Sequence, residues 1–381
     1  MGSGIHPAGN LNPTPFTPED YRVKEKLQGF SDPSSAVATE PEPHPDPHLY
    51  LAPSPPPGWD LFARSSGSYF FSTTAWTETV AAGFESDVLF AALMDGDEIL
   101  VALIGIHRKA FGFRVFHSFF PYGGLTGDPS RGDELLDLLI PALKARRYHT
   151  LVVEDPFCAL PERHVKDPTY GRRHVRLMND HPAGAGEDAL FRSYHKSVKK
   201  NVRRAREAGL VVTEATTDEE VEQIFELYRQ AMERNKAPTW YPKKLFFELL
   251  HRLVPSGDAR YLIVKDEGRV IGMMAMIYSA EGAHYWMGGS SFDALKLRVN
   301  DLLFHEAIRI SAERGDAFFD LMGSAVGDDQ LARFKEKWGG VSQDVLGYHL
   351  DLAPLRTKLF RLAYRFVRHG PGAWVIRKLN R

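Results

Sequence analysis

Hydrophobic residues follow a strand–helix–strand pattern between residues 283 and 322. An apolar run covers 283–287, apolar positions at helical spacing cover 300–314, and a second apolar run covers 317–322. Because two strands joined by a helix are normally parallel neighbours, we expect both strands in one sheet. Ligands bind beyond the carboxyl ends of such strands, so the segment after residue 322 is expected to lie over a site.

Two β-hairpins are predicted, one in each half of the chain. The first covers 88–106 around the turn DGDE, and the second covers 261–278 around the turn DEGR. The turn glycines, Gly96 and Gly268, lie 172 residues apart. This spacing predicts that one structural unit occurs twice.

The helix and strand after each hairpin repeat as well. In the first half, a helix is predicted over 134–147, interrupted by Pro141, and a strand over 151–153. They are similar to the helix over 300–314 and the strand that follows it in the second half. The pattern predicts an α/β (α+β) fold with two tandem domains, each a mixed central sheet flanked by helices. A chance likeness between two common hairpin–helix–strand units is the alternative.

Composition divides the chain further. Residues 1–58 hold thirteen of the 25 prolines and little apolar periodicity, so we expect a disordered tail. We predict a first domain over 59–185, a second over 186–352, and a basic amphipathic segment over 353–381.

Charge and cysteine content exclude several classes of protein. The 381 residues carry a net charge of −2, so binding to a polyanion would need a local basic surface. The single cysteine excludes an internal disulfide framework, and no histidine spacing indicates a metal site. With no bilayer-spanning run and no signal-peptide core, we expect a cytoplasmic protein, with a peripheral contact at the inner face of the membrane as a further option.

A basic helix is predicted between the two repeats, within FRSYHKSVKKNVRRAREAGLVV (191–212). One broad face carries five positive charges and no acidic residue, which favours phosphate binding. A solvated helix without a ligand is the alternative. The five residues are Lys196, Lys199, Lys200, Arg203 and Arg204.

Three segments together suggest a family. SVKKNVRRAREAGLVV, NDLLFHEAIRISAERGDAFFDLMGS and LARFKEKWGG resemble the Fem-type peptidoglycan aminoacyltransferases and their broader GNAT-like relatives. The resemblance is strongest over 190–345, and its most specific element is the pattern FK-x-x-[FW]-G, which begins here at Phe334 and Lys335. It implies a double GNAT-like fold and transfer of an acyl or aminoacyl group to an amine. In the Fem-type enzymes the donor is an aminoacyl-tRNA and the acceptor is a peptidoglycan precursor.

The expected chemistry requires a cation near the reacting carbonyl. Attack of an amine on an ester or thioester forms a tetrahedral oxyanion. The resemblance implies that Lys335 stabilises it and that Phe334 packs at the acyl carbon; alternatively, Phe334 is a core residue and Lys335 points into solvent. The amine must also lose a proton, for which Asp320 and Tyr285 are the candidates.

The donor is predicted from the loop before the helix at 300. Acyl-CoA-dependent GNAT proteins hold a pyrophosphate there on a glycine-rich backbone, but this chain has DALKLRVND, without glycine. Lys296 and Arg298 would hold phosphate by their side chains instead. We therefore expect no permanently bound cofactor, and as donor an aminoacyl-tRNA or a carrier-protein thioester rather than acyl-CoA.

The segment after residue 352 is basic throughout. Its apolar stripe and basic residues suit an anionic membrane surface, docking onto the domain, or RNA contact equally. The chain as a whole is then either an acyltransferase that acts on a peptidoglycan or polysaccharide precursor, or a non-catalytic GNAT-like module that binds phosphorylated glycan, lipid or RNA. Eight residues carry the basic charge: Arg356, Lys358, Arg361, Arg365, Arg368, Arg377, Lys378 and Arg381.

Overall fold

The computed structural model describes residues 47–359 and 362, with short gaps. The gaps are 67–69, 111–112, 119–120, 157–158, 168–169, 182–183, 236–238, 240, 281 and 326–327. Most of the predicted Pro-rich tail and of the basic C-terminal segment, together with Cys158, lie outside the described residues.

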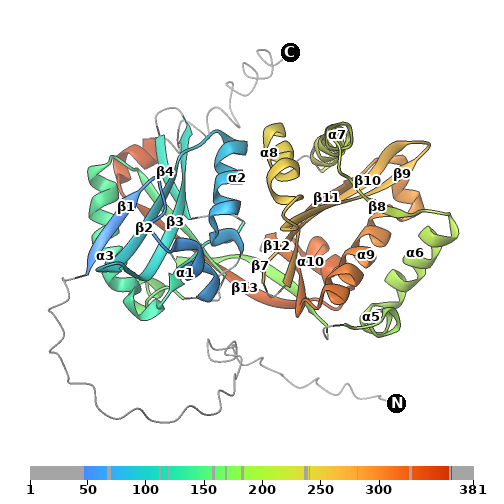
Figure 1. The fold of residues 1–381 in the computed structure, drawn as a ribbon, viewed down its shortest axis with the longest axis horizontal. Coiled ribbons are helices and arrows are strands. Elements are labelled where there is room, and N and C mark those ends of the chain that lie inside the picture. Colours follow the sequence, from blue (N-terminus) through green and yellow to red (C-terminus); the bar gives the residue numbers. More distant parts are fainter. Residues whose placement is uncertain are drawn as a thin grey trace, which may run out of the picture. The chain divides into compact units, whose positions relative to one another are not determined.

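One continuous thirteen-stranded sheet organises the described part of the chain (Figure 1). A short strand, β5 (Thr126–Gly127), pairs with β3 outside the main order. That order is β1 (His48–Ala52), β2 (Val88–Asp95), β3 (Glu98–Ala110), β4 (Phe113–Ser118), β6 (Thr150–Asp155), β13 (Val341–Asp351), β7 (Tyr170–Asp180), β12 (Phe318–Ala325), β11 (Gly282–Ser290), β10 (Arg269–Tyr278), β9 (Ala259–Asp266) and β8 (Val212–Glu214).

The strand order confirms the internal repeat. Outward from the central β13–β7 pair, the first half continues with β6, β4, β3, β2 and β1. The second half continues with the corresponding strands in the same order: β12, β11, β10, β9 and β8. The β11–β12 pair is parallel, as the strand–helix–strand pattern over 283–322 predicted. The corresponding β4–β6 pair of the first half is parallel too, and the other neighbours are antiparallel. The turn glycines Gly96 and Gly268 both have positive φ, at 57° and 79°. Both turns thus use glycine for the left-handed conformation.

The two halves exchange their last strands. β13, from the second half, pairs with β6 of the first half, and β7, from the first half, pairs with β12 of the second. The two central sheets that the pattern predicted are therefore joined into one. Sequence periodicity could not predict this exchange. An antiparallel strand from either half would form the same backbone hydrogen bonds with β6 or β12.

Local signals place the helices well. α7 (Asp218–Arg234) begins at a capping box between Thr217 and Glu220, and α9 (Val299–Arg314) ends at Gly315 with φ 84°. α3 (Gly132–Ala145) continues through Pro141. The other helices are α1 (Trp59–Ser65), α2 (Thr74–Phe84), α4 (Glu162–Val165), α5 (Glu187–Ser193), α6 (Lys196–Glu207), α8 (Lys243–Glu248) and α10 (Asp329–Glu336), with the short helical segments η2 (Phe70–Ser72), η3 (Pro129–Arg131), η4 (Leu249–Leu253) and η5 (Asp293–Leu297).

The first strand corrects the predicted tail. His48–Ala52 lies within the segment 1–58, yet it forms β1 and pairs with β2 from His48↔Met94 to Ala52↔Phe90. Its four apolar residues, LYLA, suit a strand that packs on both faces, and the Pro-rich composition around it obscured that signal. No helix in the described ranges is both long enough and apolar enough to cross a bilayer.

An apolar core joins the two halves. Trp76 of α2 meets Trp286 of β11 edge-on, with ring centroids 6.0 Å apart. α2 and α8 lie side by side (Figure 1), and Gly83 of α2 lies directly against Leu245 of α8. A Cβ atom there would lie 2.6 Å from the Cα atom of Leu245.

We expect Gly83→Ala to destabilise the protein, although alanine is the better helix former. The overlap with Leu245 should outweigh the propensity gain and lower the free energy of unfolding by about 1–3 kcal/mol, measured by urea denaturation. Gly186→Ala is the control, because a Cβ there meets nothing within 4 Å. An unchanged or higher stability of Gly83→Ala would show that the helix contact is looser than described.

Candidate functional site

The parallel strands of the second half separate at their carboxyl ends. β11 and β12 pair only at Gly282↔Phe318, Ala283↔Phe319 and His284↔Asp320. Beyond that point β11 continues to Ser290 and β12 to Ala325 without pairing to each other. The sheet therefore opens here, at the edge where ligands bind in such folds.

Lys335 lies at this opening and is buried. It belongs to α10, whose first turn is capped by Asp328, and its side chain is 2% exposed. Its Nζ atom donates hydrogen bonds to the carbonyl oxygens of Met322 (2.8 Å) and Gly323 (2.7 Å). The alternative that places Lys335 in solvent is therefore wrong.

Burial changes the acidity of this lysine. Loss of solvent lowers the pKa of Lys335 to about 8, and the negative charges of Asp320 and Asp328 oppose that shift. The ammonium and the free amine are thus both accessible near neutral pH, which is a common property of catalytic groups.

A kink in β12 directs the two carbonyl groups toward Lys335. Met322 has φ 62°, a left-handed conformation that is rare outside glycine, and the pairing of β12 with β7 shifts register between Asp320 and Gly323. The Asp320 carboxylate accepts a hydrogen bond from the Met322 N–H at 2.7 Å. Asp320 therefore stabilises the turn that positions the lysine's partners.

Asp320 is itself part of a buried polar cluster. Its second oxygen lies 3.0 Å from Nδ1 of His284, and both side chains are fully buried. Tyr122, from the first half, adjoins the carboxylate: burial, and then the charge and hydrogen bonding of Asp320, raise the pKa of its hydroxyl well above 10. Phe71, also from the first half, packs edge-on against His284 at 5.0 Å.

His284 and Tyr122 were missed by sequence reasoning. A histidine inside the apolar run AHYWM was a usable signal, since a polar residue buried in a strand needs a partner. Nothing local marked Tyr122, because its neighbour Asp320 is far away in the sequence. Asp320 was predicted as a proton acceptor, and its enclosure favours a positioning role instead.

Aromatic side chains line the same region. Tyr285 packs on Phe304 (4.7 Å between ring centroids), and Phe304 packs on Phe334 (5.4 Å) and Trp338 (5.5 Å). Phe334 is only partly buried, so it is a core contact that still reaches the surface of the site. Burial raises the pKa of Tyr285 to about 12, which keeps its hydroxyl protonated at neutral pH. Tyr285 is therefore better suited to donate a hydrogen bond than to accept a proton.

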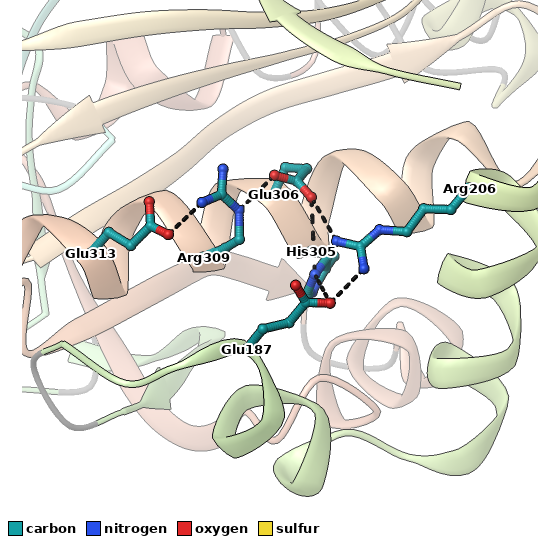
Figure 2. Close-up of polar contacts among 6 residues, drawn as sticks. All are labelled: Glu187, Arg206, His305, Glu306, Arg309 and Glu313. Atoms are coloured by element: carbon teal, nitrogen blue, oxygen red, sulfur yellow. Dashed lines mark hydrogen bonds and ion pairs between the residues drawn. The ribbon is translucent and has the colours of Figure 1, made fainter. Parts of the chain in front are cut away.

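α6 has one side anchored to the protein. Val198, Val202 and Ala205 are buried in the core of the second half. Figure 2 shows Arg206 reaching from α6 to Glu187 of α5 and Glu306 of α9. Beside this ion pair, burial among the rings of Phe191 and Tyr194 lowers the pKa of His305 to about 4.

The opposite side of α6 carries the predicted basic face. Among the described residues no carboxylate forms an ion pair with any of the five cations, in contrast to Arg206. They line a surface hollow of about 600 Å³ together with Glu207. The residues are Lys196, Lys199, Lys200, Arg203 and Arg204.

The other predicted phosphate ligands lie on a neighbouring element. Lys296 in η5 and Arg298, which precedes α9 with φ 64°, are exposed. The side chain of Asn201 in α6 donates to the carboxylate of Asp301 at 3.1 Å, which ties α6 to the first turn of α9. Burial raises the pKa of Asp301, and the positive charges of Arg298 and Lys337 act against that shift. Asp301 thus links α6 to the start of α9, and Arg298 lies close enough to act on the same carboxylate.

Comparison with known proteins identifies the fold. Residues 192–336 match the family model described as an acetyltransferase (GNAT) domain. The solved structure of FemX is 15% identical with a TM-score of 0.63, and the match covers 81% of this chain and 99% of FemX. Comparison with curated proteins gave no significant match.

Two further structures share the fold. A conserved protein of unknown function from Bacteroides thetaiotaomicron is 13% identical (TM-score 0.53; 79% of this chain and 99% of that one). The C-terminal domain of a protein described as a lysylphosphatidylglycerol synthetase, from Agrobacterium fabrum, is 11% identical (TM-score 0.51; 77% and 92%). These likenesses confirm the Fem-like, GNAT-type fold expected from the sequence.

We expect Asp320→Ala to lower the free energy of unfolding by about 3 kcal/mol, because a buried imidazole and a buried N–H would lose their carboxylate. Asp320→Asn should cost less, since its amide oxygen can still accept from Met322. Chemical denaturation measures both, and Asp329→Ala at the exposed start of α10 should behave as wild type. Equal stability of all three variants would contradict the proposed cluster.

Proposed function

We propose that this protein is an N-acyltransferase or aminoacyltransferase, because residues 192–336 match the model of a GNAT domain and the described chain has the fold of FemX. It would move an acyl or aminoacyl group from an activated donor to an amine of a peptidoglycan or polysaccharide precursor. The observation that carries the proposal is the buried Lys335, held where β11 and β12 separate.

Lys335 is suited to stabilise the oxyanion. The acceptor amine attacks the ester or thioester carbon, a C–N bond forms, and the carbonyl oxygen becomes negative. An ammonium group has three N–H bonds; two bind the carbonyls of Met322 and Gly323, and we assign the third to the oxyanion. The C–O or C–S bond then breaks, and the amine proton leaves with the departing oxygen or sulfur, so no side-chain base is required.

The start of α9 supports a donor other than acyl-CoA. Asp301 places a buried carboxylate in the first turn, where a pyrophosphate would need the backbone N–H groups of the helix. Arg298 occupies the left-handed position before the helix, where glycine would allow closer approach of a phosphate. We infer that phosphate is held by side chains, namely Lys296 and Arg298 with Lys196, Lys199, Arg203 and Arg204 of α6. An aminoacyl-tRNA or a carrier-protein thioester fits this arrangement.

The acceptor class rests on resemblance. The Fem-type pattern around Lys335 implies a cell-envelope precursor, and the protein from Agrobacterium fabrum is named for making an aminoacylated phospholipid. The exposed basic face of α6 also favours a second candidate, a non-catalytic module that binds phosphorylated glycan, lipid or RNA. A variant of Lys335 separates the two.

Lys335→Met should lower kcat about 10²–10³-fold and leave KM nearly unchanged, because the ammonium acts mainly on the transition state. The assay offers aminoacyl-tRNA and acetyl-CoA as donors and amine-bearing envelope precursors as acceptors. Lys337→Met, at an exposed neighbouring position, is the control, and thermal melts confirm folding. A binding module would show no turnover with any donor, and its ligand affinity would depend on Lys199 and Arg203 but not on Lys335.

Turnover should fall above pH 8. The pKa of Lys335 is about 8, so the ammonium is present below that pH and is lost as the pH rises through it. With hydroxylamine, a weakly basic acceptor that stays unprotonated in this range, kcat should decline with a midpoint near pH 8. The residual turnover of Lys335→Arg should lack that decline, since arginine stays charged. A kcat that rises through pH 8 would indicate that the free amine of Lys335 acts as a base.

A further inference from the structure

The chain after β13 turns into a helix that is fixed to the first half by polar contacts. Residues 354–359 are helical. The backbone N–H groups of Leu352 and Ala353 donate to the carbonyl of His149 at 2.9 and 3.2 Å. Thr357 is 2% exposed, and its hydroxyl donates to the carbonyls of His149 and Ala353. The inward side of this helix is therefore its threonine side.

The outward side is apolar. Leu355, Leu359 and Leu362 are 80%, 67% and 66% exposed. Their spacing of four and three residues places them on one stripe of a helix. A helix that packs on a protein normally buries such a stripe, whereas this one buries a hydroxyl and presents leucine. A contiguous apolar stripe at a surface is typical of an interaction site.

Positive charge accompanies the leucines. Residues 352–381 contain eight arginine and lysine residues and no aspartate or glutamate, in a chain whose net charge is −2. Arg356 and Lys358, in the described helix, are exposed beside the leucines. Apolar residues next to basic residues on one short helix are the pattern of helices that lie in the interface of an anionic bilayer.

We propose that the helix starting at Pro354 docks this protein on a bilayer that contains anionic lipid. The leucine side chains would enter the region between headgroups and acyl chains, and Arg356 and Lys358 would lie against lipid phosphates. The proposal does not depend on catalysis at Lys335, and it would place the protein beside membrane-bound acceptors.

Charge distinguishes the bilayer from other occupants. A second copy docking through the same surface would bring the same positive charges against it, and the chain after residue 362 has that sign too. RNA would neutralise the basic residues but leave three leucines in water. Of these three occupants, the anionic bilayer satisfies both features.

The full-length protein should sediment with vesicles of phosphatidylcholine and phosphatidylglycerol, and much less with phosphatidylcholine alone. The triple variant Leu355→Ser, Leu359→Ser, Leu362→Ser should bind the anionic vesicles about tenfold more weakly or less, because the stripe supplies the apolar contact. Lys358→Glu should weaken binding most at low salt. Leu61→Ser is the matched control: Leu61 is 77% exposed on α1, and its loss should leave binding unchanged.

Several results would overturn the proposal. They are absence of binding to anionic vesicles, wild-type binding by the triple variant, or equal weakening by Leu61→Ser. A wild-type dimer in light scattering that the triple variant converts to monomer would assign the surface to a second copy. Acyl transfer to a water-soluble amine should be unchanged in the triple variant, so this test is separate from the test of Lys335.

Discussion

A buried ammonium group held by two backbone carbonyls is the interaction on which the described site depends. Carbonyl groups can turn toward Lys335 only because β12 leaves the extended conformation at Met322, whose φ is 62°. That conformation is unfavourable for a side chain other than glycine, and the Asp320 carboxylate offsets the cost by accepting the Met322 N–H. The same carboxylate keeps a negative charge near the lysine. Asp320 thus determines both the backbone geometry at Met322 and the charge beside Lys335.

The exchange of strands makes both halves necessary to that site. Because β7 lies against β12, the kinked strand is supported on one side by a strand from the first half. Phe71 and Tyr122, also from the first half, enclose His284 and Asp320. The separation of β11 from β12 opens the sheet at the same place. The first half therefore contributes to the chemistry of the second through packing and burial, although Lys335 belongs to the second.

The outer surface of the second half shows how one helix serves two purposes. α6 is anchored by its apolar stripe and by Arg206, whose charge two glutamates neutralise. The five cations on its other side have no such partners among the described residues. A cation that stabilises the fold is normally paired, whereas unpaired cations of one sign raise the local positive potential. On α6, the cation that is paired with carboxylates therefore marks the side that stabilises the fold, and the cations without a carboxylate partner in the described ranges mark the side proposed to bind phosphate.

Local sequence patterns determined much of this protein. The hairpin turns at Gly96 and Gly268, the capping box of α7, the Gly315 terminus of α9 and the parallel β11–β12 pair were all predictable, because each depends on neighbouring residues or a short connection. The FK pattern also led to Lys335. Only the tertiary structure decided the exchange of β7 and β13, the partnership of Asp320 with His284 and Tyr122, and the outward direction of the leucines on either side of Thr357. Those features join residues far apart in the chain. Hydrophobic periodicity indicates which side of a helix or strand is apolar, but it does not indicate which other part of the protein packs against that side.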